Sequence, residues 1–152
     1  MAFDTIDAKI LEILQENARA SVSELSKRIN LSISAVSERL KKLEASGIIK
    51  EYTAVLNPQM LNRQLQLSVR VKTDGGNADG AFLRFVSESG EILQCMQVAG
   101  SCDYMLRVAT ESTESLSALL AQLRAIKGVN DTECEVFLKV IKEKHSVPPI
   151  VE

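Results

Sequence analysis

Tryptophan is absent from this chain of 152 residues, and aromatic residues together make up only 4% of it. Apolar residues still reach 45%, which is enough for a packed core and too many for a disordered chain. The core must therefore be aliphatic. No apolar run approaches the roughly 18 residues that span a bilayer, so we expect no membrane segment. The first residues, MAFDTIDAKI, lack the basic start of a signal peptide, so we expect a cytoplasmic protein.

Cysteine and histidine are scarce, which limits metal and catalytic chemistry. Cys95, Cys102 and Cys134 are odd in number and form no CxxC pair, so we expect free thiols. The single histidine, His145, lies in a polar stretch and is expected to be solvated. Motifs of P-loops, nucleophile elbows, zinc proteases and EF-hands are missing. We therefore expect no enzyme, no catalytic residues, no metal and no cofactor.

A strong basic charge is also lacking, since the net charge is −2. This argues against a protein that coats nucleic acid indiscriminately. Residues 27–42 nevertheless hold five basic side chains and one acidic side chain. A local basic stripe on a nearly neutral protein suits specific docking on DNA better than bulk phosphate neutralisation.

The first third of the chain predicts three short helices. Apolar residues recur at helical spacing over Thr5–Asn17, Val22–Ile29 and Ile33–Ser46. Ser21 and Glu24 have the spacing of a capping box, and Gly47 suits the position after the third helix. Two helices joined by about three residues are the helix-turn-helix pattern. Residues 48–56 are β-branched and aromatic, so we expect a wing strand followed by a linker.

The remainder alternates strands and helices after a break at Asn57–Pro58. The expected strands are residues 65–72, 92–99, 104–110 and part of 129–142, the expected helices are 78–88 and 115–126, and Gly75–Gly76 is a turn. The order β-α-β-β-α-β is that of a ferredoxin-like sheet with two helices on one face. Self-association would cover the other face. We predict an α+β protein with a helix-turn-helix domain at 1–63 and a second domain at 64–152.

The third predicted helix is the candidate for reading DNA. Val36, Leu40 and Leu43 form its inner face, and the opposite face is polar and basic. A helix in the major groove meets base edges near its N-terminus, while its basic groups meet phosphates. The candidate DNA-binding residues are Lys27, Ser32, Ser34, Ser37, Glu38, Arg39, Lys41 and Lys42. An ordinary solvated amphipathic helix would carry a similar stripe, but the tight turn and the capped helix before it favour DNA binding.

Three stretches resemble the Lrp/AsnC family, the leucine-responsive and asparagine regulators of bacteria and archaea. The first is DxIDxxIL from Asp4, followed by Asn17-Ala18-Arg19. The second is RLxxLExxGII from Arg39, continued by YTAxLNP from Tyr52. The third is VAGxxDY from Val98. The resemblance covers nearly the whole chain and keeps the order of its elements.

The resemblance implies a winged helix-turn-helix followed by a βαββαβ domain of the RAM or ACT-like type that senses an amino acid. It implies double-stranded DNA as a partner and homodimers that assemble to octamers, with the effector between dimers. The effector-binding residues it implies are Gln97, Val98, Ala99, Gly100, Ser101, Asp103, Tyr104, Thr113, Glu135, Val136 and Phe137. We thus expect a nucleoid-associated transcriptional regulator.

The loop that ends at Tyr104 allows two interpretations. Asp103 or Ser101 could accept from the ammonium of an amino acid, and N–H groups near Gly100 could bind its carboxylate. Gly100 and Asp103 are also typical of a simple β-turn. The residues alone favour the turn, whereas the resemblance favours the site. A polar Gln97 and an acidic Glu135 lead to the hypothesis of a polar or cationic effector.

Two other functions remain open. An architectural protein would wrap DNA without any small ligand, and a wild type with no detectable ligand would indicate it. An enzyme built on the second domain would show turnover after deletion of residues 1–56, because fold alone does not decide function.

Overall fold

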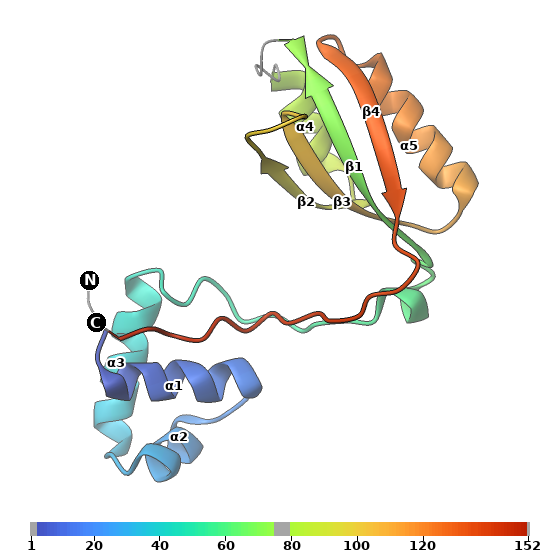
Figure 1. Ribbon diagram of the computed structural model, residues 1–152. Helices are drawn as coiled ribbons and strands as arrows, with labels where there is room; N and C mark the ends of the chain where they lie inside the picture. The colour runs from blue at the N-terminus through green and yellow to red at the C-terminus, as the bar shows by residue number, and fades with distance from the viewer. Residues whose placement is uncertain (1–2, 75–79, 152) are drawn as a thin grey trace. The chain divides into compact units, whose positions relative to one another are not determined.

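The computed structural model describes residues 3–74 and 80–151, and its contacts divide the chain into two compact units (Figure 1). The head contains the described residues up to Val55 and those from Lys142 onward, whereas the body runs from Leu56 to Ile141. This division differs from the expected boundary after residue 63 in two places. Residues 56–63 group with the body, and the tail, residues 142–151, groups with the head.

Three helices form the head: α1 (Thr5–Glu16), α2 (Val22–Ile29) and α3 (Ile33–Ala45). Their bounds agree closely with the sequence prediction. Aliphatic side chains from all three helices meet in one core, and their burial is the main stabilising contribution. The buried core residues are Ile10, Ile13, Leu14, Leu25, Val36 and Leu43.

Each helix of the head begins at a side chain that caps it. Asp4 accepts the N–H groups of Ile6 and Asp7 at 2.9 and 2.8 Å. Ser21 forms the predicted capping box with Glu24, whose carboxylate accepts the Ser21 N–H at 2.7 Å. Ser32 caps α3. These bonds satisfy backbone donors that a helix start leaves unpaired, so they fix where each helix begins.

The wing strand predicted over residues 48–56 is not formed. These residues carry no strand assignment and pair with no other strand in the described part of the chain. Ile49 packs against the core of the head, but Val55 and Leu56 are exposed. β-branched residues favour an extended backbone, yet a strand also needs hydrogen bonds to a partner strand, and among the described residues no strand pairs with this segment.

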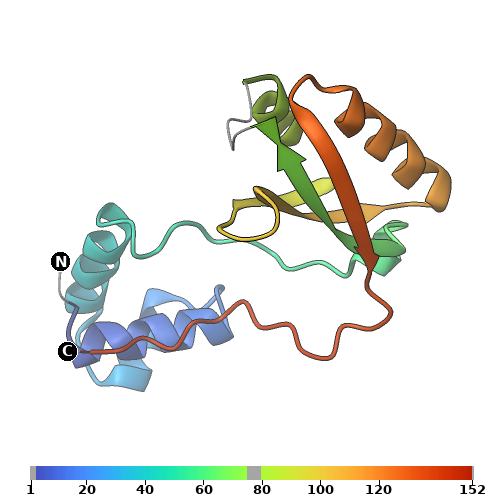
Figure 2. The same ribbon diagram turned by 45° about the horizontal axis from the view of Figure 1, so that its top comes forward.

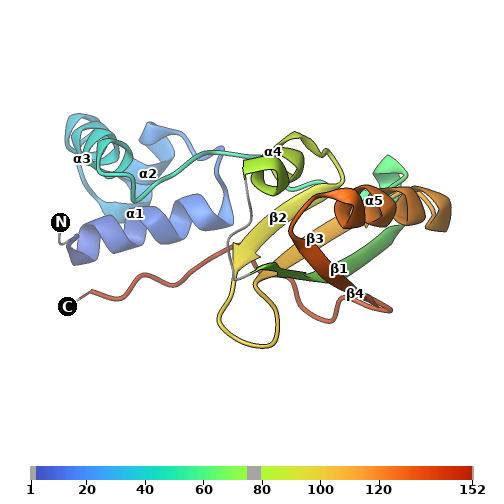
Figure 3. The ribbon, with the colours of Figure 1, turned by 90° about the horizontal axis from the view of Figure 1, so that it is seen from above.

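The body has the predicted βαββαβ order. Its elements are a 3₁₀ turn η1 (Pro58–Leu61), β1 (Leu65–Thr73), α4 (Gly80–Glu88), β2 (Ile92–Gln97), β3 (Tyr104–Thr110), α5 (Thr113–Ala125) and β4 (Val129–Val136). The strands form one antiparallel sheet in the order β2-β3-β1-β4. Helices α4 and α5 lie on the same face of it (Figure 3). The predicted α+β class, a helix-turn-helix head with a ferredoxin-like body, is confirmed.

The body core lies between the sheet and its two helices. Alternate residues of β1 and β3, including Leu67, Val69 and Leu106, are buried there beside Phe82 of α4 and Leu123 of α5. The intervening residues of the strands form the outer sheet face, which the two helices leave uncovered. From the strand registers, this face carries Gln66, Ser68, Arg70, Lys72, Met96, Met105, Arg107, Asp131, Glu133 and Glu135.

Three element ends differ from the prediction. β4 stops at Val136, which pairs with Leu67 of β1, and Leu138 beyond it is 98% exposed. β2 ends at Gln97, where the loop to β3 begins. α5 starts at Thr113 because Ser112 caps it. The predicted turn at Gly75–Gly76 and the first two residues of the predicted helix 78–88 lie outside the described residues.

The tail runs beside α1 in the head (Figures 1 and 2). The N–H of Val147 donates to the side-chain oxygen of Gln15 on α1. Residues 145–149 line a groove of about 660 Å³ together with α1 and residues 48–55. The head is therefore built from both ends of the chain. None of the helices in the described residues is long and apolar enough to cross a membrane.

Candidate DNA interface and effector loop

Helix α3 presents a polar and basic face, as the sequence predicts. Val36 and Leu43 are buried in the head, whereas Ser34, Glu38 and Lys41 are exposed. Lys42 is also exposed, and Lys27 lies exposed on the preceding helix α2. A helix with one buried and one charged face can enter a DNA groove without disturbing its own core.

The turn before α3 holds the start of this helix in place. Asn30 adopts a left-handed conformation with φ +58°, and Leu31 donates its N–H to Ser26 at 3.1 Å. Ser32, a predicted DNA-binding residue, accepts the Ala35 N–H at 3.2 Å, so its side chain caps α3. Its hydroxyl lies 3.1 Å from that of Ser34. This cap was not predicted from the sequence, although a serine before a helical apolar pattern is its usual signal.

The exposed charges of α3 differ in their partners. Lys42 pairs with Glu38 at 3.0 Å, one turn apart on the helix. This hydrogen bond and the charge of Lys42 lower the pKa of Glu38. Lys41 has no hydrogen-bond or ion-pair partner among the described residues, so its ammonium is available to a phosphate. Ile33, at the start of the helix, is 57% exposed and was not singled out from the sequence.

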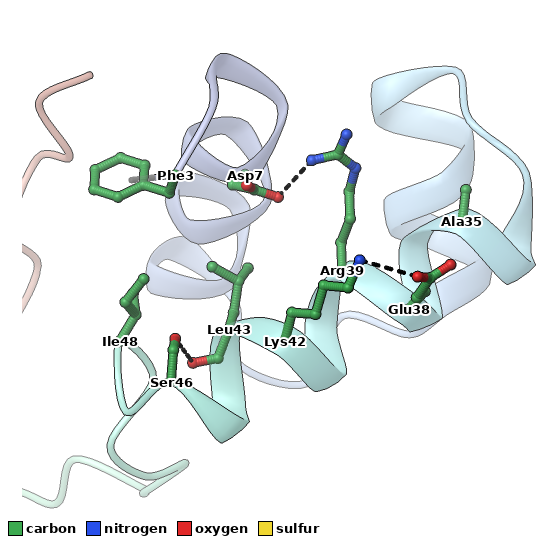
Figure 4. Close-up of a pocket in the computed structure, with 9 residues that line it drawn as sticks. All are labelled: Phe3, Asp7, Ala35, Glu38, Arg39, Lys42, Leu43, Ser46 and Ile48. Atoms are coloured by element: carbon green, nitrogen blue, oxygen red, sulfur yellow. Dashed lines mark hydrogen bonds and ion pairs between the residues drawn. The ribbon is translucent and has the colours of Figure 1, made fainter. Parts of the chain in front are cut away.

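Arg39 has partners within the head that the sequence analysis did not foresee. Its Nη1 lies 2.7 Å from Asp4 Oδ2 and 2.8 Å from Asp7 Oδ1. The close-up in Figure 4 shows its guanidinium extending from α3 toward Asp7 on α1. It lines a hollow of about 410 Å³ with Asp7, Glu38 and Lys42. The hydrogen bonds that Arg39 donates to Asp7 and to Asp4, with Asp7 the larger cause, raise the pKa of Arg39.

Asp103 anchors the loop between β2 and β3. Its Oδ2 accepts the Thr73 N–H at 2.7 Å and the Thr73 hydroxyl at 3.1 Å. Its own N–H donates to Val71 at 3.0 Å, and its carbonyl accepts the Val98 N–H at 2.9 Å. These bonds tie the loop to the end of β1. Thr73 could not be identified from the sequence, because it lies 30 residues before Asp103.

The predicted effector residues of this loop differ in exposure. Gln97, Ala99, Gly100 and Ser101 are exposed, and Val98 is half-buried. Tyr104 belongs to the body core instead, where its ring centroid lies 4.9 Å from that of Phe82.

The predicted effector residues fall into two groups at opposite ends of the sheet. The loop meets β1 at Val71, whereas Phe137 donates its N–H to Gln66, five residues away along the same strand. At the usual rise of a strand this separation is about 17 Å. Thr113 lies at the end where Phe137 lies, since it follows β3. One chain therefore cannot bring both groups to one small molecule.

Glu135 is engaged on the outer sheet face. Its carboxylate accepts from Arg70, which also lies 3.5 Å from Glu133. Arg70 offsets part of the charge of these two carboxylates and so reduces their attraction for a cationic effector. Within the described residues, no group of three or more histidine, cysteine or acidic side chains could hold a metal ion.

Comparison with known proteins matches two family models to the chain. Residues 3–50 match the family model of a winged helix-turn-helix DNA-binding domain, and residues 66–147 match that of the Lrp/AsnC ligand binding domain. The HTH-type transcriptional regulator FL11 of Pyrococcus furiosus is 34% identical over 95% of both chains. The leucine-responsive regulatory protein of Escherichia coli K12 is 37% identical over 93% of this chain and 88% of its own.

Two solved structures are similar along almost the whole chain. A transcriptional regulator of Neisseria meningitidis in complex with L-methionine has a TM-score of 0.89 and 37% identity, and the match covers 97% of each chain. A feast or famine regulatory protein of Mycobacterium tuberculosis complexed with L-methionine has a TM-score of 0.89 and 30% identity, over 97% of this chain and 100% of its own.

Proposed function

This chain belongs to the Lrp/AsnC family of DNA-binding transcriptional regulators, and we propose that it reads specific DNA sites with α3 under the control of an amino acid bound by the body. The observation that carries the first part is the exposed basic face of α3 behind a capped helix and a tight turn. Such an arrangement presents one helix end to base edges and its lysines to phosphates. We expect the protein in the cytoplasm, associated with the nucleoid.

The residues of this face take different parts in the proposed DNA contact. Ser34, Ser37 and Glu38 lie toward the start of α3, where side chains meet base edges. Lys27, Lys41 and Lys42 supply charge for phosphates, and Ser32 acts through the cap that it gives α3. Lys42 must exchange Glu38 for a phosphate, whereas Lys41 need break no ion pair.

The DNA contact is tested with Lys41→Ala. Duplexes that bind wild-type protein are first selected from a random library, and binding is then measured over a range of salt concentrations. Loss of one phosphate contact should reduce the slope of log affinity against log salt by about 1 and weaken all sequences alike. Lys127→Ala removes an equal, exposed charge from the body and should leave the slope unchanged. Equal slopes for both variants would exclude Lys41 from the interface.

We propose further that the effector binds between two copies of the chain. The Gln97–Asp103 loop and the group of Thr113, Glu135, Val136 and Phe137 lie at opposite ends of the sheet in one chain. In a second copy of the body, the sheet end that carries Thr113 and Phe137 could meet the loop of the first copy. The two copies together would then complete a site around a small molecule. Dimers that pair through the outer sheet face and assemble to octamers would supply such contacts.

The effector class is tested by titrating the protein with single amino acids. Two similar proteins were crystallised with L-methionine, and the Arg70–Glu135 ion pair makes a cationic effector less favourable. We therefore expect methionine or leucine, rather than lysine or arginine, to produce a heat signal in calorimetry. A response to basic amino acids alone would restore the hypothesis of a cationic effector. No response to any amino acid would favour the architectural function.

A further inference from the structure

We propose that Arg39 is a positioning residue that sets the orientation of α3 for DNA, through Asp4 and Asp7, and makes no contact with a base. This role rests on the proposed DNA-binding function. Arg39 was predicted from the sequence to contact DNA directly, and the proposed role replaces that contact with an intramolecular one.

Asp4, Asp7 and Arg39 form a single cluster of charged side chains. Asp4 is the N-cap of α1, and Asp7 accepts the Asp4 N–H at 3.1 Å, so both carboxylates belong to the start of that helix. Arg39 reaches them from the middle of α3, over sequence separations of 35 and 32 residues. Its Nη1 contacts both carboxylates at once. The cluster therefore fixes the rotation of α3 relative to the start of α1.

The packing of the three head helices leaves the orientation of α3 relative to α1 to be fixed by such a link. Helix α2 packs closely against both α1 and α3, whereas the backbones of α1 and α3 approach each other at few points. Apolar contacts in the core are not directional and allow small rotations of a helix. A planar guanidinium held by two carboxylates on another helix is directional, because its donors point in fixed directions.

Burial keeps Arg39 with its acidic partners. The Asp7 side chain is only 16% exposed, and that of Arg39 is 30% exposed. If the guanidinium turned to a base, Asp7 would remain partly buried and without its counter-ion, which is unfavourable. The raised pKa of Arg39, caused by Asp7 and then Asp4, agrees with this coupling.

The surroundings make the cluster relevant to DNA. The hollow in Figure 4 is lined by Asp7 and Arg39 together with Glu38 and Lys42 of the proposed DNA-contacting face. Two acidic groups of α1 thus lie near a surface that must approach phosphates. Their pairing with Arg39 both reduces that repulsion and holds the helix that carries the contacts.

Neutralising Asp7 distinguishes positioning from simple electrostatics. Asp7→Asn removes a negative charge close to the proposed DNA surface, so electrostatics alone would strengthen binding to every sequence. Positioning requires the opposite for the selected site, because α3 loses its link to α1. We expect Asp7→Asn and Arg39→Gln each to weaken binding to the selected duplex about tenfold, an effect typical of breaking a partly buried charge pair.

The experiment compares the selected duplex with a scrambled one, over a range of salt concentrations. The expected result is a lower ratio of selected to scrambled affinity and an unchanged salt slope. Asp7→Asn combined with Arg39→Gln should cost no more than either change alone, because both break one link. Arg63→Gln removes an equal charge from the body, where Arg63 pairs with Glu91, and serves as the control that keeps both the affinity ratio and the salt slope.

Several results would overturn the proposal. A salt slope reduced by about 1 in Arg39→Gln would identify a direct phosphate contact. Stronger binding by Asp7→Asn would show that its charge acts only by repulsion. Arg39→Lys keeps the charge but not the planar donors, and it is the more conservative change for the fold. It should also lower the ratio of selected to scrambled affinity. A folded Arg39→Lys variant with the wild-type ratio would exclude directional positioning. If wild-type protein selected no duplex, the DNA-binding function itself would fail.

Discussion

At the scale of single residues, hydrogen bonds between distant positions fix the two candidate sites. Tyr52 donates its hydroxyl to Glu44 at 2.9 Å and so holds the segment after α3 against that helix. Asp103 similarly joins its loop to Thr73. In both cases the polar side chain forms a hydrogen bond within the protein itself, to another side chain or to the backbone.

The Tyr52 hydroxyl should titrate at unusually high pH. Burial, and then the hydrogen bond and charge of Glu44, raise the pKa of Tyr52 from 10.0 to about 12. Because the pKa is higher in the folded state, the stabilisation is complete below pH 10.0 and is lost as the pH rises toward about 12. The chain has two tyrosines, so phenolate absorbance of Tyr104→Phe reports Tyr52 alone. In Glu44→Gln the titration should move toward the ordinary value; an unchanged curve would contradict this cause.

Replacing Asp103 should destabilise the body. Asp103→Ala removes the two hydrogen bonds that Thr73 donates to the charged Asp103 carboxylate, at a cost of about 2 kcal/mol in the free energy of unfolding. Urea unfolding measures this loss, and Ser101→Ala, at an exposed position of the same loop, should change little. An Asp103→Ala variant with full stability but no response to amino acids would instead make Asp103 a direct effector ligand.

At the scale of elements, helix ends determine how the head is arranged. The N-caps Asp4, Ser21 and Ser32 start the three helices. Gly47 follows α3 with φ +76° and donates its N–H to Glu44 at 3.0 Å, while Ile49 donates to Leu43 at 3.2 Å. This turn ends α3 and brings Ile49 back to the core.

Gly47→Ala should weaken the head. A side chain at φ +76° is strained, and the expected loss is about 1 kcal/mol in the free energy of unfolding. Space is not the cause, since an added Cβ would contact nothing within 4 Å. Gly90→Ala is the matched control, because that glycine also has open space but lacks a left-handed φ. Equal thermal unfolding of the two variants would contradict the assignment of strain to Gly47.

Local sequence patterns predicted most of the helices and strands. The features that were not predicted depend on contacts between residues that are far apart in the sequence. Helix α2 and the turn that follows it were predicted from the capping box of Ser21 and Glu24 and from the periodic apolar residues. Both signals lie within a few residues of each other. The alternation through Val136, Leu138 and Val140 predicted a longer β4, but its pairing with β1 ends at Val136, opposite Leu67. Arg39 and Asp103 were recognised as polar site residues, yet their partners lie 30 or more residues away and leave no local signal.

At the scale of the whole molecule, the outer sheet face is the surface we propose for dimer formation. Helices α4 and α5 cover the opposite face, and the central strands β1 and β3 present Arg70 and Met105 side by side on this one. A second copy of the chain can cover the open face of such a sheet through a two-fold interface. The proposed effector site requires the same kind of contact between copies.

Charge introduced on this face should break the dimer. Met105→Lys places a positive charge beside Arg70, so two faces brought together would repel each other. Sedimentation equilibrium should then give the mass of one chain, whereas wild type gives two or a multiple of two. Gln122→Lys adds the same charge on an exposed position of α5 and should keep the wild-type mass. A dimeric Met105→Lys variant would place the interface elsewhere.

The path of the tail sets an order of events during synthesis. The three helices of the head leave the ribosome first, and the whole body follows before residues 142–151 emerge. The helices can pack around Leu25 and Val36 early, but the side of α1 that carries Gln15 stays open until the tail arrives. The unit proposed to read DNA is therefore completed only after the unit proposed to bind the effector and to form dimers has been made.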